Sequence, residues 1–279
     1  MKNYILILHC LFFLLFLSPN YAFQKESNLK ILTWNIQDLG RTKDDSEIHF
    51  IAEILKDYDL VAIQEIVAKD PAGAKAVTRI ADELNRLGSK WDYSISNPTQ
   101  SSSSNIRERY AYLWKTSKIK LKKEASLDTE LASVIEREPY IGMFETKNGN
   151  VFYAINMHAR TYNKHPEMEI SKFKKYPERL KSNNIIILGD FNLNEKHSVW
   201  NPLYKMGFNA AIKNIKTSMK RKCNKGKYMH KTVDNIFYNS EKAEKIDSGV
   251  IDFIKNCDNL LNARSISDHV PVYLEVKIN

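Results

Sequence analysis

The stretch NIIILGDFN, from Asn184 to Asn192, decides how this chain folds. Its four consecutive apolar residues are typical of a strand that is buried on both faces of a sheet. Gly189 permits a tight exit from that strand or a close approach of another backbone. If the chain stays extended there, Asp190 and Asn192 point to the same face and place a carboxylate beside an amide. Such a pair can align a water and a phosphate, although Gly, Asp and Asn also form turns.

The N-terminal segment is typical of a secretory signal peptide. Lys2 gives a basic start, residues 5–17 are almost all apolar, and residues 18–22 form a small, polar exit. We expect cleavage after Ala22 and a secreted or periplasmic mature protein; a retained N-terminal anchor is the alternative. No later stretch of the sequence is apolar enough to span a bilayer, so we expect no stable membrane association after cleavage.

Residues 23–279 have the length of one large α/β domain or two small ones. They contain no linker rich in Pro, Gly or Ser that would separate two domains, and no internal repeat. A domain of this size can bury a substantial hydrophobic core and does not need disulfides or metal ions for stability. We therefore expect a single domain over residues 23–279 and a monomeric protein.

The chain is basic, with 42 Lys and Arg against 33 Asp and Glu and a formal net charge of +9. A secreted basic protein attracts polyanions such as nucleic acid, anionic lipid or sulfated sugar, although a generally Lys-rich, soluble surface has the same balance. Cys10 leaves with the signal peptide. Cys223 and Cys257 then remain in an oxidising compartment, as one disulfide or as two free thiols.

Apolar strands and amphipathic helices are mixed along the chain. Strands are expected at 29–35, 59–65, 91–96, 109–115, 118–122, 140–146, 151–157, 185–189, 233–238 and 270–277. Helices are expected at 47–56 after a Ser46 cap, at 73–87, and at 167–180 with an interruption at Pro177. Residues 213–231 form a basic segment with little periodicity. This mixture predicts an α/β fold in which two mixed sheets pack face to face with helices outside.

Polar residues cluster at the ends of the expected strands, where a layered α/β protein presents its site. Singly, each has a structural explanation as a cap, a turn residue or a satisfied side chain at a strand edge. Every one of them nevertheless adjoins an apolar strand, where a surface charge is unnecessary. The residues are Asn35, Glu65, Glu108, His158, Asp190, Asn192, Asp234, Asp268 and His269. Together they predict a functional site.

The motifs around these residues resemble those of the endonuclease/exonuclease/phosphatase superfamily, and most closely its deoxyribonuclease I branch. The matching pieces are Thr33-Trp34-Asn35-Ile36, Ile63-Gln64-Glu65, Arg107-Glu108-Arg109-Tyr110, Arg137-Glu138-Pro139, Met157-His158, Gly189-Asp190-Phe191-Asn192, Val233-Asp234-Asn235-Ile236 and Ser267-Asp268-His269-Val270-Pro271-Val272. They occur in the family's order from about Leu29 to the end of the chain. The resemblance implies one catalytic domain with a four-layer α/β/β/α sandwich of two mixed, mostly antiparallel sheets, and a divalent-metal phosphodiesterase.

The resemblance also implies a role for each matching residue. Asn35 and Glu65 would hold Mg²⁺, with Asp268 as a further acid beside the metal; Ca²⁺ and Mn²⁺ are further candidates. His158 would be oriented by Glu108, and His269 by Asp234. Asp190 and Asn192 would align water and phosphate. Arg137 would contact a substrate phosphate.

These residue types suit phosphodiester hydrolysis. A hard cation held by oxygen ligands neutralises charge on the phosphorane. In-line attack needs a base on one side and an acid on the other, and two histidines paired with carboxylates can supply both. We assign His269 as the base and His158 as the acid; the reverse, with Asp190 sharing the base role, remains open.

Two positions depart from the deoxyribonuclease pattern. Val67 stands where that family tends to place an arginine that enters the minor groove, and Ile106 stands where it has a tyrosine that packs on a sugar. Arg107, Arg109 and the basic segment at residues 213–231 could grip phosphates instead, with sequence-blind and salt-sensitive contacts. A solvated Lys-rich loop is the alternative for that segment.

The sequence therefore predicts a secreted, Mg²⁺-dependent, non-specific DNA endonuclease. The alternative is a phosphodiesterase or phosphatase of the same superfamily that acts on lipid or inositol phosphates, like a sphingomyelinase or a related toxin subunit. Such an enzyme should carry an exposed aromatic hairpin, and we find no convincing one. Trp200 and Tyr204 are expected on a helix that packs on the core. A non-catalytic polyanion-binding protein would have no use for two histidine–carboxylate pairs.

Overall fold

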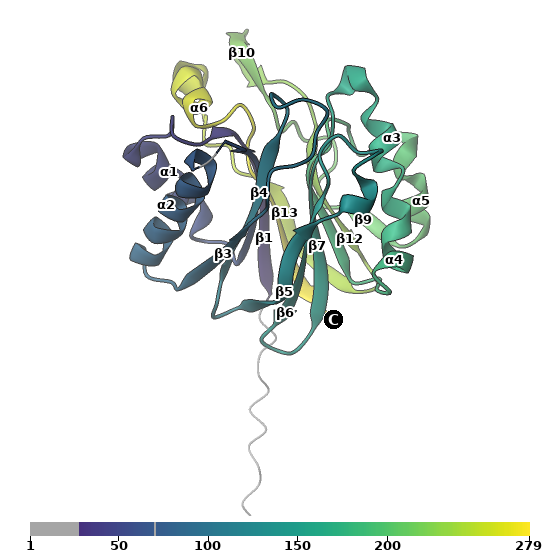
Figure 1. The fold of residues 1–279 in the computed structure, drawn as a ribbon. Helices are drawn as coiled ribbons and strands as arrows, with labels where there is room; N and C mark the ends of the chain where they lie inside the picture. The colour runs from purple at the N-terminus through teal and green to yellow at the C-terminus, as the bar shows by residue number, and fades with distance from the viewer. Residues whose placement is uncertain (1–27, 70) are drawn as a thin grey trace, which may run out of the picture.

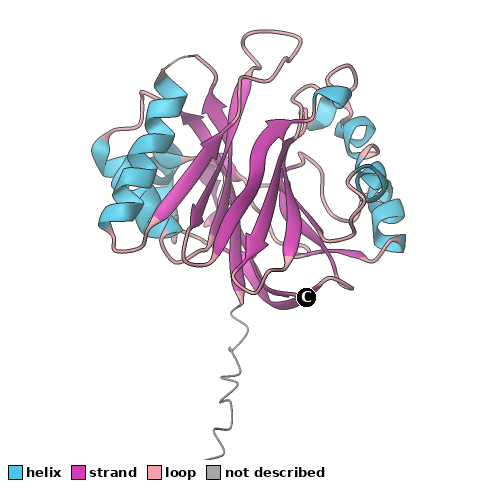
Figure 2. Ribbon diagram, turned by 60° about the horizontal axis from the view of Figure 1, so that its bottom comes forward, coloured by secondary structure: helices cyan, strands magenta, loops and turns pink. Residues whose placement is uncertain are grey.

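The structure is a computed structural model that describes residues 28–69 and 71–279. The predicted signal peptide at residues 1–22, its cleavage after Ala22 and Cys10 lie outside these residues. The described chain forms two six-stranded sheets packed face to face, with helices on both outer faces (Figure 1, Figure 2). This architecture confirms the predicted four-layer α/β/β/α sandwich.

The first sheet has the strand order β13-β14-β1-β2-β4-β3, and the second has the order β5-β6-β7-β8-β12-β9. The first contains β1 (Leu29–Leu39), β2 (Leu60–Val67), β3 (Trp91–Ile95), β4 (Glu108–Lys115), β13 (Ala243–Val250) and β14 (Val272–Ile278). The second contains β5 (Ile119–Leu127), β6 (Tyr140–Thr146), β7 (Val151–His158), β8 (Ile185–Asp190), β9 (Phe208–Ala210) and β12 (Asp234–Asn239).

Each sheet has one parallel pair at its centre, and its other neighbours are antiparallel. The pairs are β1–β2 in the first sheet and β7–β8 in the second. Because the strands of a parallel pair end at the same edge, each pair brings together the polar residues that follow its two apolar runs. His158 lies directly opposite Asp190 in the second sheet. The fold thus delivers two sets of strand ends to one region.

Three apolar cores hold the layers together. The first core lies under α1 (Asp45–Leu55), α2 (Ala72–Arg86) and α6 (Leu260–Ile266). The second core lies between the two sheets. The third core lies under α3 (Pro166–Ile170), α4 (Tyr176–Arg179) and α5 (Asn201–Lys205). Trp200 is fully buried in the third core, as expected, and stacks on Phe237 with ring centroids 4.0 Å apart. Among the described residues, no helix is both long and apolar enough to cross a membrane.

Two helix predictions need correction. The N-cap of α1 is Asp44 rather than Ser46, because the Asp44 carboxylate accepts the Glu47 N–H at 2.8 Å while the Glu47 carboxylate accepts the Asp44 N–H at 3.0 Å. The single helix expected at 167–180 is divided into α3, a 3₁₀ turn at Phe173–Lys175 and α4. The break precedes Pro177, which lies in the first turn of α4, where proline is favoured.

The basic segment contains a hairpin that the sequence did not reveal, formed by β10 (Met219–Asn224) and β11 (Lys227–Met229). A disulfide joins Cys223 of this hairpin to Cys257, with the two Cα atoms 5.7 Å apart. At its base, the Met219 N–H donates to the Asp268 carbonyl at 2.7 Å. The hairpin, labelled at β10 in Figure 1, is therefore fixed directly to the segment that carries His269.

Candidate active site

The end of β8 can lie against β7 only because residue 189 is glycine. Gly189 has φ +140°, and a Cβ at this position would lie 1.9 Å from the Met157 carbonyl oxygen. Residues with a Cβ atom rarely adopt this backbone conformation, and their Cβ would clash with the Met157 carbonyl oxygen. The close approach keeps the ladder intact to its last pair, in which His158 and Asp190 face each other.

The chain turns immediately after Asp190 and does not remain extended. Asn192 has φ +50°, its N–H donates to Asp190 Oδ1 at 2.8 Å, and its side-chain amide donates to the Ala159 carbonyl at 3.1 Å. Phe191 anchors the turn in the third core, with its ring centroid 5.1 Å from that of Trp200. The condition under which Asp190 and Asn192 would share one face of an extended strand is therefore not met, and the turn alternative holds. Asn192 instead orients the Asp190 carboxylate from a turn.

The first histidine pair is almost completely buried. His158 Nδ1 lies 2.9 Å from Glu108 Oε2, and the same carboxylate oxygen lies 3.0 Å from Arg137 Nε. The other Glu108 oxygen accepts the Glu65 N–H at 3.3 Å. Burial opposes the charged state of Glu108, but His158 and Arg137 outweigh it and lower the pKa of the carboxyl group. Glu108 is thus shared between an imidazole, a guanidinium and a backbone N–H.

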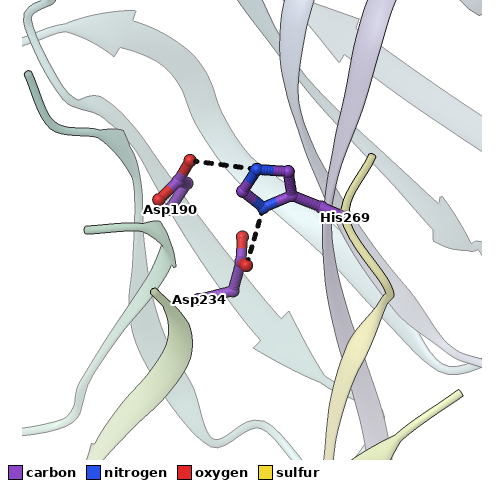
Figure 3. A group of neighbouring side chains, drawn as sticks. All are labelled: Asp190, Asp234 and His269. Atoms are coloured by element: carbon purple, nitrogen blue, oxygen red, sulfur yellow. Dashed lines mark hydrogen bonds and ion pairs between the residues drawn. The ribbon is translucent and has the colours of Figure 1, made fainter. Parts of the chain in front are cut away.

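The second histidine pair, His269 and Asp234, lies beside Asp190 (Figure 3). His269 Nδ1 lies 2.8 Å from Asp234 Oδ2, and the N–H of Asp234 donates to the Thr217 hydroxyl at 3.0 Å. His269 Nε2 lies 3.9 Å from carboxylate oxygens of both Asp190 and Asp268. Burial opposes the imidazolium, but Asp234 and then Asp190 outweigh it, and the pKa of His269 is raised well above its ordinary value.

Asp190 Oδ2 lies between the two imidazoles. It is 3.5 Å from His158 Nε2 and 3.9 Å from His269 Nε2, and it accepts the Asn35 amide at 3.2 Å. Burial raises the pKa of Asp190, and the neighbouring Asp234 carboxylate raises it further. The two histidine pairs therefore converge on one carboxylate that β8 supplies.

Asn35 and Glu65 come from the parallel pair of the first sheet. The Asn35 amide donates to Glu65 Oε1 at 2.9 Å. Glu65 has φ +59° and sits at a register shift between Ile63 and Ile66 of β2, which turns its side chain toward the cluster. Burial raises the pKa of Glu65, and Glu108 adds to that effect. The first sheet thus contributes an amide and a carboxylate beside Asp190.

The structure separates the two predicted arginines. Arg137 lies in the cluster on Glu108, and its guanidinium also donates to the Ala159 carbonyl at 3.3 Å. Arg109 instead donates to the carbonyls of Ser96 at 2.9 Å and Ala68 at 3.3 Å. It holds the ends of β2 and β3, and the structure does not bring it to the histidines.

Several supporting residues were not predicted. The Ser267 hydroxyl donates to the Asn35 carbonyl at 2.6 Å and accepts the His269 N–H at 3.0 Å, so it links the Asn35 and His269 segments on the side of the first sheet. Gln64 and Asn156 join the sheets beneath the cluster through an amide contact of 2.6 Å. Gln64 and Asn156 had one signal in the sequence: each is a polar residue inside an otherwise apolar strand, and a buried polar side chain needs a hydrogen-bond partner.

A comparison with protein families matches the Endonuclease/Exonuclease/phosphatase family over residues 32–269. The chain belongs to the endonuclease/exonuclease/phosphatase family. Its relatives include a protein named deoxyribonuclease from Thioalkalivibrio sp. (strain K90mix), 26% identical over 62% of this chain and 49% of that protein. They also include deoxyribonuclease-1-like 1 of Homo sapiens, 25% identical over 90% of this chain and 85% of that protein. The resemblance to the deoxyribonuclease I branch is thereby confirmed.

The match spans about half the length of the bacterial relative. Among solved structures, a member of the endonuclease/exonuclease/phosphatase family from Leptotrichia buccalis C-1013-b has a TM-score of 0.62 at 18% identity. It covers 90% of this chain and 99% of that one, and so it supports the same fold.

Members of this family are hydrolases that use divalent metals, and this chain offers a matching site. Asn35 Oδ1 is buried without a hydrogen-bond partner among the described residues. An unsatisfied amide oxygen beside the Glu65 carboxylate is the kind of donor set that a hard cation completes. A second group, Asp190, Asp234 and His269, offers ligand atoms within 4.8 Å of one another. That group includes an imidazole, which suits softer metals better.

Proposed function

We propose that this protein is a secreted, divalent-metal-dependent DNA endonuclease that hydrolyses phosphodiester bonds without sequence preference. The observation that carries the proposal is the convergence of two histidine–carboxylate pairs on Asp190, next to Asn35 and Glu65. A protein that only bound polyanions would gain nothing from these pairs. Mg²⁺ is the proposed metal because Asn35 and Glu65 offer oxygen donors, with Asp268, whose Oδ1 lies 3.9 Å from His269 Nε2, as a further acid.

The residues divide the work of hydrolysis between them. The metal, when bound, neutralises charge on the phosphate as it is attacked. One imidazole takes the proton of the attacking water, and the other gives a proton to the leaving oxygen. The assignment of His269 as the base and His158 as the acid requires a neutral His269 in the working enzyme, against the raised pKa of its metal-free state. Glu108 and Asp234 fix the tautomers through Nδ1 and leave each Nε2 directed toward Asp190. Asp190, held by Asn192, aligns the water, and Arg137 attracts the phosphate.

The hairpin of β10 and β11 supports a nucleic-acid substrate. Its exposed cations are Arg221, Lys222, Lys225 and Lys227. Across the described ranges, no carboxylate lies within ion-pair distance of these four side chains. Free cations beside a phosphate-cleaving cluster suit a polymer that carries many phosphates. The Cys223–Cys257 disulfide and the apolar N-terminal segment support a secreted protein.

The test is a nicking assay with supercoiled plasmid, in Mg²⁺ and in EDTA, for wild type and the His158→Ala variant. We expect nicking that requires the metal and falls by a factor of about 10² to 10⁴ in the variant. His49→Ala is a matched control, because His49 also pairs with a glutamate, Glu83 at 2.7 Å, but lies on the helical layer. Its activity should equal that of wild type.

Folded wild-type protein that leaves the plasmid intact with Mg²⁺, Mn²⁺ and Ca²⁺ would refute the DNA endonuclease. Sphingomyelin vesicles and phosphoinositides, tested in parallel, separate the two functions on the same cluster. Cleavage of a lipid phosphodiester with loss in His158→Ala would assign the site to the alternative substrate class.

A further inference from the structure

A groove outside the catalytic cluster combines aromatic, acceptor and cationic groups. It has a volume of about 420 Å³, and its lining includes Tyr162, Asn192, Glu195, Lys196 and Lys231. Asn192 connects it to the cluster, because the N–H of Asn192 donates to Asp190 Oδ1. A second hollow, of about 400 Å³, is lined by Glu65, Glu108, Arg137 and His158. The cluster therefore borders both hollows, as suits a chain that extends beyond the reacting bond.

Tyr162 presents an uncovered aromatic face at this groove. It is 66% exposed, and Lys231 Nζ lies 5.7 Å from its ring centroid. A large exposed aromatic ring beside a cation is a typical stacking platform for a base. The phenol belongs to a 3₁₀ turn, Tyr162–Lys164, that closely follows β7 and His158.

The rest of the lining matches the remaining parts of a nucleotide. Lys196 and Lys231 are exposed, and no carboxylate among the described residues pairs with either ammonium group. Glu195 is buried; its Oε1 accepts the Asn214 N–H at 2.9 Å, and its Oε2 has no partner in the described chain. A buried acceptor without a donor suits a base N–H and repels a phosphate, whereas the lysines attract the phosphate.

We propose that this groove binds one nucleotide that flanks the scissile phosphate, with its base stacked on Tyr162 and its phosphate attracted by Lys196 and Lys231. The inference rests on the proposed nuclease function. A base can stack on Tyr162 only when it leaves its own stack, so the groove confers a preference for unpaired strands.

Binding of a fluorescein-labelled single-stranded DNA octamer in EDTA, followed by anisotropy, tests the groove without any catalysis. Tyr162→Ala should raise Kd about tenfold, since one base–aromatic stack is lost, and Tyr162→Phe should bind within about twofold of wild type. Lys231→Ala should lower the slope of log Kd against log salt by about 0.7. Lys147→Ala, in the turn at the opposite end of β7, is the matched control and should bind normally.

Cleavage rates with Mg²⁺ complete the test. Tyr162→Ala should raise KM for a single-stranded substrate with little change in kcat, since Tyr162 does not touch the reacting atoms, whereas Lys147→Ala should leave both constants at the wild-type values. The proposal that the groove binds a nucleotide would be refuted if Tyr162→Ala bound the octamer as tightly as wild type. It would also be refuted if wild type did not bind the octamer. Absence of any DNA cleavage by wild type would instead overturn the endonuclease, so the two failures are distinct.

Discussion

His158 and His269 each hold a carboxylate on Nδ1, at 2.9 Å and 2.8 Å, and each directs Nε2 toward Asp190. Their surroundings differ. Glu108, behind His158, also binds Arg137 and the Glu65 N–H. The Asp234 carboxylate, behind His269, has His269 as its near cation, and the hairpin of β10 and β11 is attached beside it.

This difference shows that two histidine–carboxylate pairs with similar geometry can contribute differently to the stability of the fold. The first pair ties β4 and β7 to a buried arginine, so its carboxylate stabilises the fold as well as the imidazole. The second pair lies where the exposed hairpin of β10 and β11 meets the core. The Asp234 carboxylate interacts mainly with the His269 imidazole. A change in either histidine should therefore affect catalysis similarly, whereas changes in the two carboxylates should differ.

The largest effect is expected from the histidines themselves. His158→Ala and His269→Ala should each lower kcat on DNA by a factor of about 10² to 10⁴, because one proton transfer is lost in each. The double variant should be only slightly worse than the poorer single variant, since the two groups act in one transition state. Single-turnover kinetics measures all three.

A substrate with an activated leaving group separates the two roles. With bis(p-nitrophenyl) phosphate, protonation of the leaving oxygen matters little, so the variant that lacks the acid should recover and the variant that lacks the base should not. Recovery of His158→Ala supports the assignment above. Recovery of His269→Ala instead would establish the reverse assignment.

The carboxylates should differ in stability. Glu108→Gln leaves the Arg137 guanidinium buried without its counter-ion and should cost about 3–5 kcal/mol of unfolding free energy. Asp234→Asn should cost about 1 kcal/mol, because His269 can lose its proton and the Thr217 contact remains. Urea unfolding in EDTA measures both. Replacing Arg137 together with Glu108 should restore part of the loss; equal losses in the two single variants would refute the comparison.

The sequence predicted α1 and α2 over the first sheet well, but it did not predict α6 there, and it predicted the helices over the second sheet poorly. α1 and α2 each present a long apolar face, which periodicity detects. α3, α4 and α5 contain four or five residues each, and aromatic packing around Phe191 and Trp200 holds them. Tertiary contacts also create β13, a polar edge strand that forms against β14. These elements have a weak local pattern, although Trp200 and Tyr204 did indicate a helix, and Tyr204 lies on α5.

The site residues were predictable as a set, but their individual directions were not. Strand ends meet because of the topology, and so the histidines and acids converge as expected. Arg109 adjoins Glu108 in the sequence, yet successive residues of a strand face opposite ways, and only β4's register shows which one faces the cluster. The positive φ of Asn192 likewise depends on Phe191 being held in the core.

The smallest expected effect is on the titration of the two imidazoles in metal-free protein. Burial opposes the charged form of both imidazoles. The Glu108 carboxylate nevertheless raises the pKa of His158, and the Asp234 and Asp190 carboxylates raise the pKa of His269 well above its ordinary value. Arg137 opposes the charge on His158. Proton NMR in EDTA should therefore show both imidazoles titrating above about 6.5, the ordinary value, with His269 above His158.

The sign of the linked stability follows from these shifts. A histidine whose pKa is raised by folding stabilises the protein fully below its unfolded pKa, about 6.5, and that contribution is lost as pH rises through its folded pKa. Unfolding free energy in EDTA should thus decline above neutral pH, and Asp234→Asn should flatten the decline more than His49→Ala does. If His158 titrates above His269, the Arg137–Glu108 contact does not compete with the imidazole, and the two pairs are electrostatically equivalent despite their different partners.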